Sequence, residues 1–123
     1  MAVLGIGVDV CDVARVARLV ERTPRSRERL FSPGEIAYAG TGPAAAERLA
    51  ARFAAKEAVI KALGGAVSGM SWHDITVDSD GAAPRLVLAG AAADQAVALG
   101  IGHWHLSLSH DAGVVIAMVV AES

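Results

Sequence analysis

Two acidic residues lie among small and apolar neighbours and are the first candidates for chemistry. Asp9 follows a run of glycine and aliphatic residues, and Glu57 stands in the alanine-rich segment 52–64, 48 positions later. A buried carboxylate is costly unless it has a partner. Carboxylate oxygens favour a hard cation such as Mg²⁺, which takes one or two protein carboxylates and lets substrate phosphates complete its octahedron. The two residues therefore predict a magnesium site, provided that the fold brings them together.

Cationic side chains flank the second of these acids. Arg52, Lys56 and Lys61 suit the negative charge of a diphosphate held at the same place. Two structural alternatives stay open. Glu57 and Lys61 are four residues apart and could form a surface ion pair on a helix, and Asp9 could be an ordinary strand-end, turn or cap aspartate.

Histidine and serine residues near the C-terminus offer two other chemistries. His103, His105 and His110 are close enough in sequence for a zinc site, which needs three or four ligands. Histidines on the polar face of a strand are the alternative. Ser107 or Ser109 could act as a nucleophile beside a histidine, but no nucleophile-elbow motif surrounds either one.

The segment around Glu57 has the composition of the second half of a long helix. Alanine, leucine and glutamate are strong helix formers, Pro43 suits the helix start, and Gly64 and Gly65 suit its end. Nearly every face of this helix is apolar, which predicts that it is buried.

Asp9 is predicted near the end of a first strand, residues 2–10. One face of this strand is aliphatic by alternation and carries Leu4, Ile6, Val8 and Val10. The opposite face holds Gly5 and Gly7 before Asp9. Glycine in a strand often marks the close approach of a ligand or of another backbone segment.

A basic ridge is predicted on the helix that follows. Asp12 can cap this helix, which runs to about Glu21, and Arg15, Arg18 and Arg22 recur on one of its faces. Residues 1–61 carry ten Lys or Arg and seven Asp or Glu, a net +3, whereas residues 62–123 have a net charge of −5. This asymmetry indicates an anionic ligand or acidic partner at the first half, although an ordinary solvated helix face is the alternative.

The remaining segments predict short helices and paired strands. Ser32 and Glu35 form a capping box around Pro33 at the start of a short helix. Further along the chain we expect strands at 72–78, 84–88, 103–109 and 112–121, a helix at 90–99, and turns at Asp80–Gly81 and 110–113. The pattern predicts a single α+β domain over residues 1–123, with a mainly antiparallel sheet packed around the long central helix.

Composition narrows the class of protein. The 123 residues are 54% hydrophobic, and the net charge is −2, which argues against non-specific nucleic-acid binding. So much apolar side chain in a small chain predicts a homo-oligomer. The longest apolar run, 112–121, is too short to span a bilayer, so no membrane partner is expected. Cys11 is the only cysteine and no secretory leader is visible, which together predict a cytoplasmic location.

Several motifs in order along the chain resemble one enzyme family. They are Gly5-Ile6-Gly7-Val8-Asp9-Val10, Leu30-Phe31-Ser32-Pro33-Gly34-Glu35, Arg52-Phe53-Ala54-Ala55-Lys56-Glu57-Ala58, Trp72-His73-Asp74-Ile75 and His105-Leu106-Ser107-Leu108-Ser109-His110. With these motifs the sequence resembles the small holo-[acyl-carrier-protein] synthases of the 4′-phosphopantetheinyl transferase family. The resemblance spans nearly the whole chain.

The resemblance implies an activity. The expected reaction transfers 4′-phosphopantetheine from coenzyme A to a serine of an acyl carrier protein, with Mg²⁺ as cofactor and adenosine 3′,5′-bisphosphate as the leaving product. Family members of this size are usually homotrimers with active sites between subunits, and the acidic carrier docks on a basic first helix.

The resemblance also implies roles for particular residues. Asp9 and Glu57 are expected to bind the metal, and Lys61 to contact the phosphates of the coenzyme. Arg52, His105 and Ser109 are expected at the coenzyme, with His110 and Asp111 among the catalytic residues. Arg15, Arg18 and Arg22 are expected to receive the carrier. The general base stays open between Glu57, a metal-bound water and His110.

Two other functions compete with this expectation. A non-catalytic oligomeric binding module would tolerate the loss of Asp9 or Glu57. Another magnesium-dependent enzyme that uses a diphosphate would not need the arginine ridge. Coenzyme-dependent modification of a carrier protein separates all three.

Overall fold

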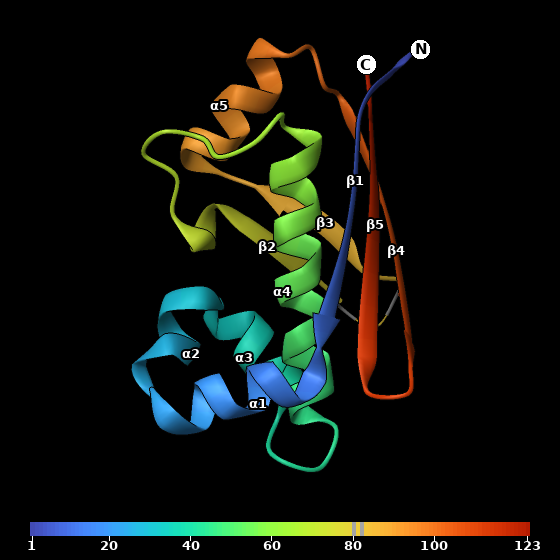
Figure 1. Cartoon of the computed structure of the whole chain (residues 1–123). Coiled ribbons are helices and arrows are strands. Elements are labelled where there is room, and N and C mark those ends of the chain that lie inside the picture. Colours follow the sequence, from blue (N-terminus) through green and yellow to red (C-terminus); the bar gives the residue numbers. More distant parts are fainter. Residues whose placement is uncertain (80, 82) are drawn as a thin grey trace.

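The computed structural model of the chain describes residues 1–79, 81 and 83–123 (Figure 1). Its elements in chain order are β1 (Val3–Asp12), α1 (Val13–Arg22), α2 (Arg25–Leu30), α3 (Pro33–Ala39), α4 (Ala45–Ala62), η1 (Trp72–Asp74), β2 (Ile75–Asp78), β3 (Arg85–Leu88), α5 (Gly90–Ala98), β4 (His103–Asp111) and β5 (Val114–Glu122). The α+β class with antiparallel sheets is confirmed, and α4 runs through the middle of the molecule.

The larger sheet has three strands in the order β1-β5-β4, and every neighbouring pair is antiparallel. A two-residue turn at Ala112–Gly113 joins β4 to β5, with both residues at positive φ. β2 and β3 form a separate antiparallel pair. In Figure 1, α4 lies between the three-stranded sheet and the α1–α3 cluster, and the two termini lie side by side at one end of the sheet.

The glycine face of β1 packs directly on the backbone of α4. A Cβ atom at Gly7 would stand 1.9 Å from the carbonyl oxygen of Ala58, and one at Gly5 would stand 2.2 Å from that of Ala62. The expected close approach is therefore to another backbone segment rather than to a ligand. Asp9 lies on this same face, so the glycines determine how near its carboxylate comes to the helix.

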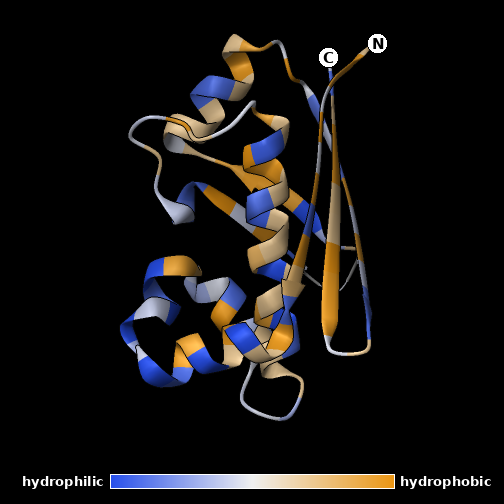
Figure 2. Cartoon of the chain, viewed as in Figure 1, coloured by the Kyte–Doolittle hydropathy of each residue, from blue (hydrophilic) through white to orange (hydrophobic). Residues whose placement is uncertain are grey.

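The aliphatic face of β1 points away from the core. Ile6 and Val10 are each 60% exposed, and Val8 is 51% exposed. Ile116 and Met118 on β5 continue the same exposed face, since they pair in register with Val10 and Val8. Figure 2 shows the hydrophobic colour running along both strands. The uncovered face of the sheet is thus apolar over β1 and β5, whereas β4 adds polar side chains to it, His105 and Ser107 among them.

Local sequence signals explain the shorter elements. Asp12 caps α1 by accepting a hydrogen bond from the amide of Ala14, as predicted. Ser32 and Glu35 form the expected capping box of α3. The structure differs at 72–78, where a strand was predicted throughout. Ser71 and Asp74 form a second capping box that turns Trp72–Asp74 into a 3₁₀ helix, and only Ile75–Asp78 is strand.

Two smaller points complete the fold. The predicted turn at Asp80–Gly81 lies partly outside the described residues, because Asp80 is not among them. None of the helices in the described part of the chain has the length and apolar character needed to cross a membrane.

Candidate active site

Asp9 and Glu57 come together where β1 crosses α4. The negative charge of Asp9 acts on Glu57 and, after burial, is the second cause that raises the pKa of the Glu57 carboxyl. Lys61 and Arg15 lower the same pKa, so both cations also lie near Glu57. Asp9 and Glu57 are thus near enough for their charges to interact, and the site is an acidic pair edged by two cations.

The donor set of this site fits Mg²⁺ and does not fit zinc. Two carboxylates satisfy a cation that leaves its other positions to water and phosphate oxygens. No group of three or more His, Cys, Asp or Glu that could hold a metal occurs among the described residues. His105 and His110 project from opposite faces of β4, which separates the histidines of the zinc alternative.

Lys61 bridges the helix to the end of β1. Its ammonium donates to the carbonyl oxygen of Val8 at 2.8 Å and lies 3.3 Å from Oδ1 of Asp9. The Asp9 side chain is 17% exposed and that of Lys61 is 54% exposed. The ion pair thus joins Lys61 to Asp9, whereas the sequence alternative paired it with Glu57.

Arg15 stands between the acidic pair and a groove on α1. The groove has a volume of about 310 Å³ and is lined by Arg15, Val16, Leu19, Leu30, Phe31 and Phe53. Arg18 and Arg22 are exposed on the same helix, so the predicted basic ridge is at the surface. The apolar floor of this groove was not predicted, because its residues come from three separate segments of the chain.

Arg52 belongs to a second polar cluster on the other side of α4. Its guanidinium stacks 4.2 Å from the ring centroid of Tyr38 and donates to the hydroxyl of Ser79. The residue is 4% exposed, and its Nε has no hydrogen-bond partner among the described residues. Arg48 also lies over Tyr38, at 5.6 Å. Arg52 also lines a groove at the surface, and guanidinium groups bind phosphates well.

The Arg52 cluster includes residues that sequence analysis missed. Tyr38 and Ser79 gave no signal, because each is brought in by tertiary packing. Arg48 could have been found from its spacing, since residues i and i+4 share a helix face.

His110 and Asp111 lie at the β4–β5 hairpin, close to the N-terminal end of α4. Nδ1 of His110 is 3.4 Å from Oε1 of Glu47. Glu47 and Glu57 are ten residues apart on the helix, roughly 15 Å of rise. Within one chain, His110 therefore lies by the Arg52 cluster and apart from the acidic pair. Ser109 lines the same groove as Arg52 and His110.

His105 lies elsewhere on the sheet. Its Nε2 is bonded to the Glu122 carboxylate on the exposed face. Ser109 is four residues further along β4, about 13 Å of strand. A place for His105 at the coenzyme stays a prediction, and within one chain it does not lie with Arg52 and Ser109.

Lys56 does not reach a ligand. Its side chain is fully buried and bonded to Glu35 at 2.9 Å, on the side of α4 away from Lys61. The expectation that Arg52, Lys56 and Lys61 surround a single diphosphate is therefore wrong. Positions 52 and 56 share one helix face, and position 61 lies on another.

Comparisons with known proteins show the family of the chain. The family model described as the 4′-phosphopantetheinyl transferase superfamily matches residues 5–119. A Frankia alni protein named holo-[acyl-carrier-protein] synthase is 56% identical over 124 residues, covering 100% of both chains.

Solved structures give the same result. The holo-[acyl-carrier-protein] synthase of Neisseria meningitidis superposes with a TM-score of 0.86 at 30% identity, covering 99% of this chain and 100% of that one. The Helicobacter pylori enzyme, solved in complex with coenzyme A, gives 0.81 at 34% identity over 95% of this chain and 99% of its own. The chain belongs to the 4′-phosphopantetheinyl transferase superfamily, and within it to the holo-[acyl-carrier-protein] synthases.

Proposed function

We propose that this chain, as a single domain of residues 1–123, transfers 4′-phosphopantetheine from coenzyme A to a serine of an acyl carrier protein, with Mg²⁺ as cofactor. The convergence of Asp9 and Glu57 beside Lys61 carries this proposal. The serine oxygen forms a bond to the β-phosphorus, and the bond from that phosphorus to the bridging oxygen breaks. Adenosine 3′,5′-bisphosphate leaves with the electron pair of the broken bond.

Each residue of the site has a part in this reaction. Asp9 and Glu57 hold the cation, which when bound supplies Lewis-acid stabilisation of the diphosphate charge. Lys61 moves from Asp9 to the phosphate oxygens and offsets the charge that builds on them. An oxygen of the Glu57 carboxylate that does not hold the cation accepts the serine proton. Arg52, which lines a groove together with Ser109 and His110, binds a phosphate group of the coenzyme.

We further propose that the enzyme is a cytoplasmic homotrimer with its active sites between subunits. The uncovered apolar sheet face around Ile6 and Met118 supports an assembly of copies. An assembly also offers a way for His110 and Asp111 of one copy to reach the acidic pair of another. Within one chain the long helix separates the two groups.

The deciding experiment incubates the chain with coenzyme A, Mg²⁺ and an unmodified acyl carrier protein, and follows the carrier by intact mass spectrometry. We expect the carrier to gain one phosphopantetheine group, and chelation of the metal to stop the gain. Glu57→Gln should slow transfer about 100-fold or more, since it removes charge at the reacting centre. Asp94→Asn on α5 is the matched control and should transfer normally. Absence of the mass gain, or a fully active Glu57→Gln, would refute the proposal.

Arg15 is proposed to dock the acidic carrier. Replacement by glutamate should raise the KM for the carrier about tenfold at low salt and less at high salt, because screening weakens the attraction. Coenzyme KM should hardly change. Arg27→Glu, the same charge reversal on α2 in a groove that Arg15 does not line, is the control. Equal damage to both substrates would instead assign Arg15 to the coenzyme site.

A further inference from the structure

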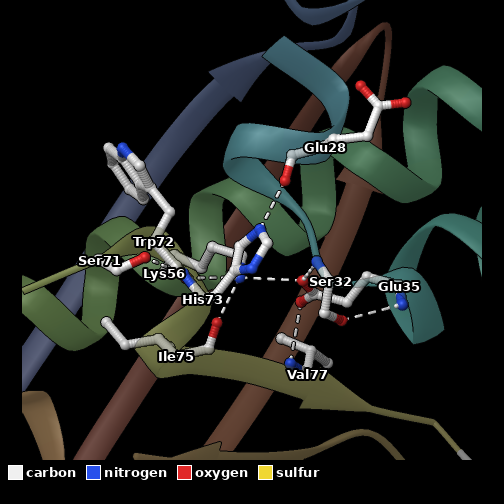
Figure 3. Close-up of polar contacts among 9 residues, drawn as sticks. All are labelled: Glu28, Ser32, Glu35, Lys56, Ser71, Trp72, His73, Ile75 and Val77. Atoms are coloured by element: carbon white, nitrogen blue, oxygen red, sulfur yellow. Dashed lines mark hydrogen bonds and ion pairs between the residues drawn. The ribbon is translucent and has the colours of Figure 1, made fainter. Parts of the chain in front are cut away.

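Lys56 is a fully buried lysine whose ammonium is enclosed by acceptors (Figure 3). Its Nζ lies 2.9 Å from Oε1 of Glu35 and 3.0 Å from the carbonyl oxygen of Trp72, and it also donates to the carbonyl of Ile75. An ammonium has three donors, and here each one has a partner. The side chain therefore joins α4 to α3 and to the segment that begins at Trp72.

Glu35 completes the connection from the other side. Its Oε1 accepts from the amide of Ser32 at 2.9 Å, and its Oε2 accepts from the amide of Val77 at 3.0 Å (Figure 3). One carboxylate thus caps α3, holds β2 in place and neutralises Lys56. Burial lowers the pKa of Lys56, while the charge of Glu35 acts in the opposite direction and favours the ammonium.

Stability alone is a poor reason for this pair. Removing two charges from water costs several kcal/mol each, and well-packed apolar residues of similar volume often stabilise a fold as well or better. Apolar contacts are not directional, whereas hydrogen bonds hold particular backbone carbonyl and amide groups at fixed positions. The network is therefore expected to determine where the bonded segment lies.

That segment contacts residues of both sites, Phe53 of the Arg15 groove and Arg52 of the polar cluster. The ring centroids of Trp72 and Phe53 are 5.5 Å apart, and Phe53 lines the Arg15 groove. Downstream of Ile75, strand β2 leads to Ser79, the hydroxyl that accepts from Arg52. This end of β2 also lines a cavity of about 710 Å³ next to α3. Residues 71–79 thus contact Phe53 of the Arg15 groove on one side and the Arg52 cluster on the other.

A second bond supports the segment from outside the core. Nε2 of His73 lies 2.6 Å from the carbonyl oxygen of Glu28 on α2 (Figure 3). The 3₁₀ turn is therefore held between α2 and α4, and of these two anchors only Lys56 is fully buried.

We infer that Lys56 is a positioning residue which, through Glu35, holds residues 71–79 in place. The Arg15 groove and the Arg52 cluster thereby keep their positions relative to Glu57. Lys56 touches no substrate and precedes Glu57 directly in sequence. The inference rests on the proposed function, because it assigns the Arg15 groove to the carrier protein and the Arg52 cluster to coenzyme A.

The test compares Lys56→Met, Glu35→Gln and the double variant. Each single change leaves a charge or its partner unmatched in the core and should lower the Tm by several degrees or more. The double variant is neutral, so part of the lost Tm should return, although the glutamine oxygen can accept from only one of the two backbone N–H groups that Glu35 binds. If Lys56 positions the segment, the double variant keeps KM values about tenfold above wild type for both coenzyme A and carrier. Its Mn²⁺ affinity should stay unchanged.

A readout that does not depend on activity follows Trp72 directly. In a Trp104→Phe background Trp72 is the only tryptophan, and in the double variant its emission should shift and become more open to acrylamide quenching. Val59→Ala, a buried change on α4 outside this network, should lower the Tm without moving either signal. A double variant with wild-type KM values and wild-type Trp72 emission would overturn the inference. A wild-type chain that modifies no carrier would instead overturn the proposed function.

Discussion

At the scale of single residues, Glu57 carries a negative charge that the fold disfavours. Burial and the neighbouring Asp9 raise the pKa of its carboxyl, and Lys61 and Arg15 only partly offset them. Its pKa is thus higher in the folded chain than in the unfolded chain. Glu57 therefore favours folding below its ordinary pKa of about 4.3, and this contribution is lost as the pH rises through the folded value. A bound cation would remove the cost at neutral pH.

The raised pKa of Glu57 predicts a pH-dependent difference in melting temperature between wild type and Glu57→Gln, which can be measured without substrate. In metal-free buffer at pH 8, Glu57→Gln should melt at a higher temperature than wild type, because glutamine carries no charge there. The gap should shrink as the pH falls toward 4, where the wild-type carboxyl is protonated, and also when saturating Mg²⁺ is added at pH 8. Calorimetry across this range measures it. A gap that widens on acidification would contradict the assignment.

At the scale of elements, the contact between β1 and α4 brings the acidic pair together. Gly5 and Gly7 let the strand lie on the carbonyl groups of the helix, which no residue with a Cβ allows. Asp9 follows two residues after Gly7 on the same face. The separation of strand and helix therefore determines whether Asp9 and Glu57 can share one cation.

Gly7→Ala should accordingly damage both the fold and the metal site. A methyl group 1.9 Å from the Ala58 oxygen forces the elements apart, at a cost of about 3 kcal/mol. Urea unfolding should show the loss, and Mn²⁺ titration at a temperature where the variant is still folded should show weaker binding. Gly42→Ala is the control, since nothing lies within 4 Å of a Cβ there. Similar results for the two variants would reject this account of the close approach.

At the scale of the whole molecule, the single chain leaves its sheet half covered. One face packs on α4, whereas the other exposes Ile6, Val8 and Met118. Exposed apolar faces of this kind mark interaction surfaces. Copies of the same chain are the proposed occupant, in agreement with the small size and high apolar content of the sequence.

Light scattering tests the assembly. Wild type should give a mass about three times the 12.5 kDa of one chain. A lysine at Ile6 or Met118 should produce monomers, because an unpaired charge cannot be buried in an apolar interface. Val97→Lys on α5, also at an exposed apolar residue, should leave the mass unchanged. A fully active wild-type monomer would defeat the proposal.

Mixing variants tests whether subunits share a site. Glu57→Gln and His110→Ala should each be slow, and co-expressed mixtures should recover activity if His110 of one copy serves the acidic pair of another. The mixed oligomers, isolated through two different tags, would then contain sites with both residues intact. Mixtures as slow as the single variants would show that Glu57 and His110 of different copies do not share a site.

The sequence by itself determined the features that depend on local signals. Alternation, helix composition and the two cap motifs at Asp12 and Ser32 predicted most elements and the α+β class, and the family motifs predicted the acidic pair. Only tertiary structure decided which cation serves which role. Lys56 and Lys61 look alike in sequence, but one turns into the core to bond with Glu35 and the other reaches Asp9 at the surface. The reason is physical: the environment of a side chain depends on the elements packed against its face, and those elements come from distant parts of the chain.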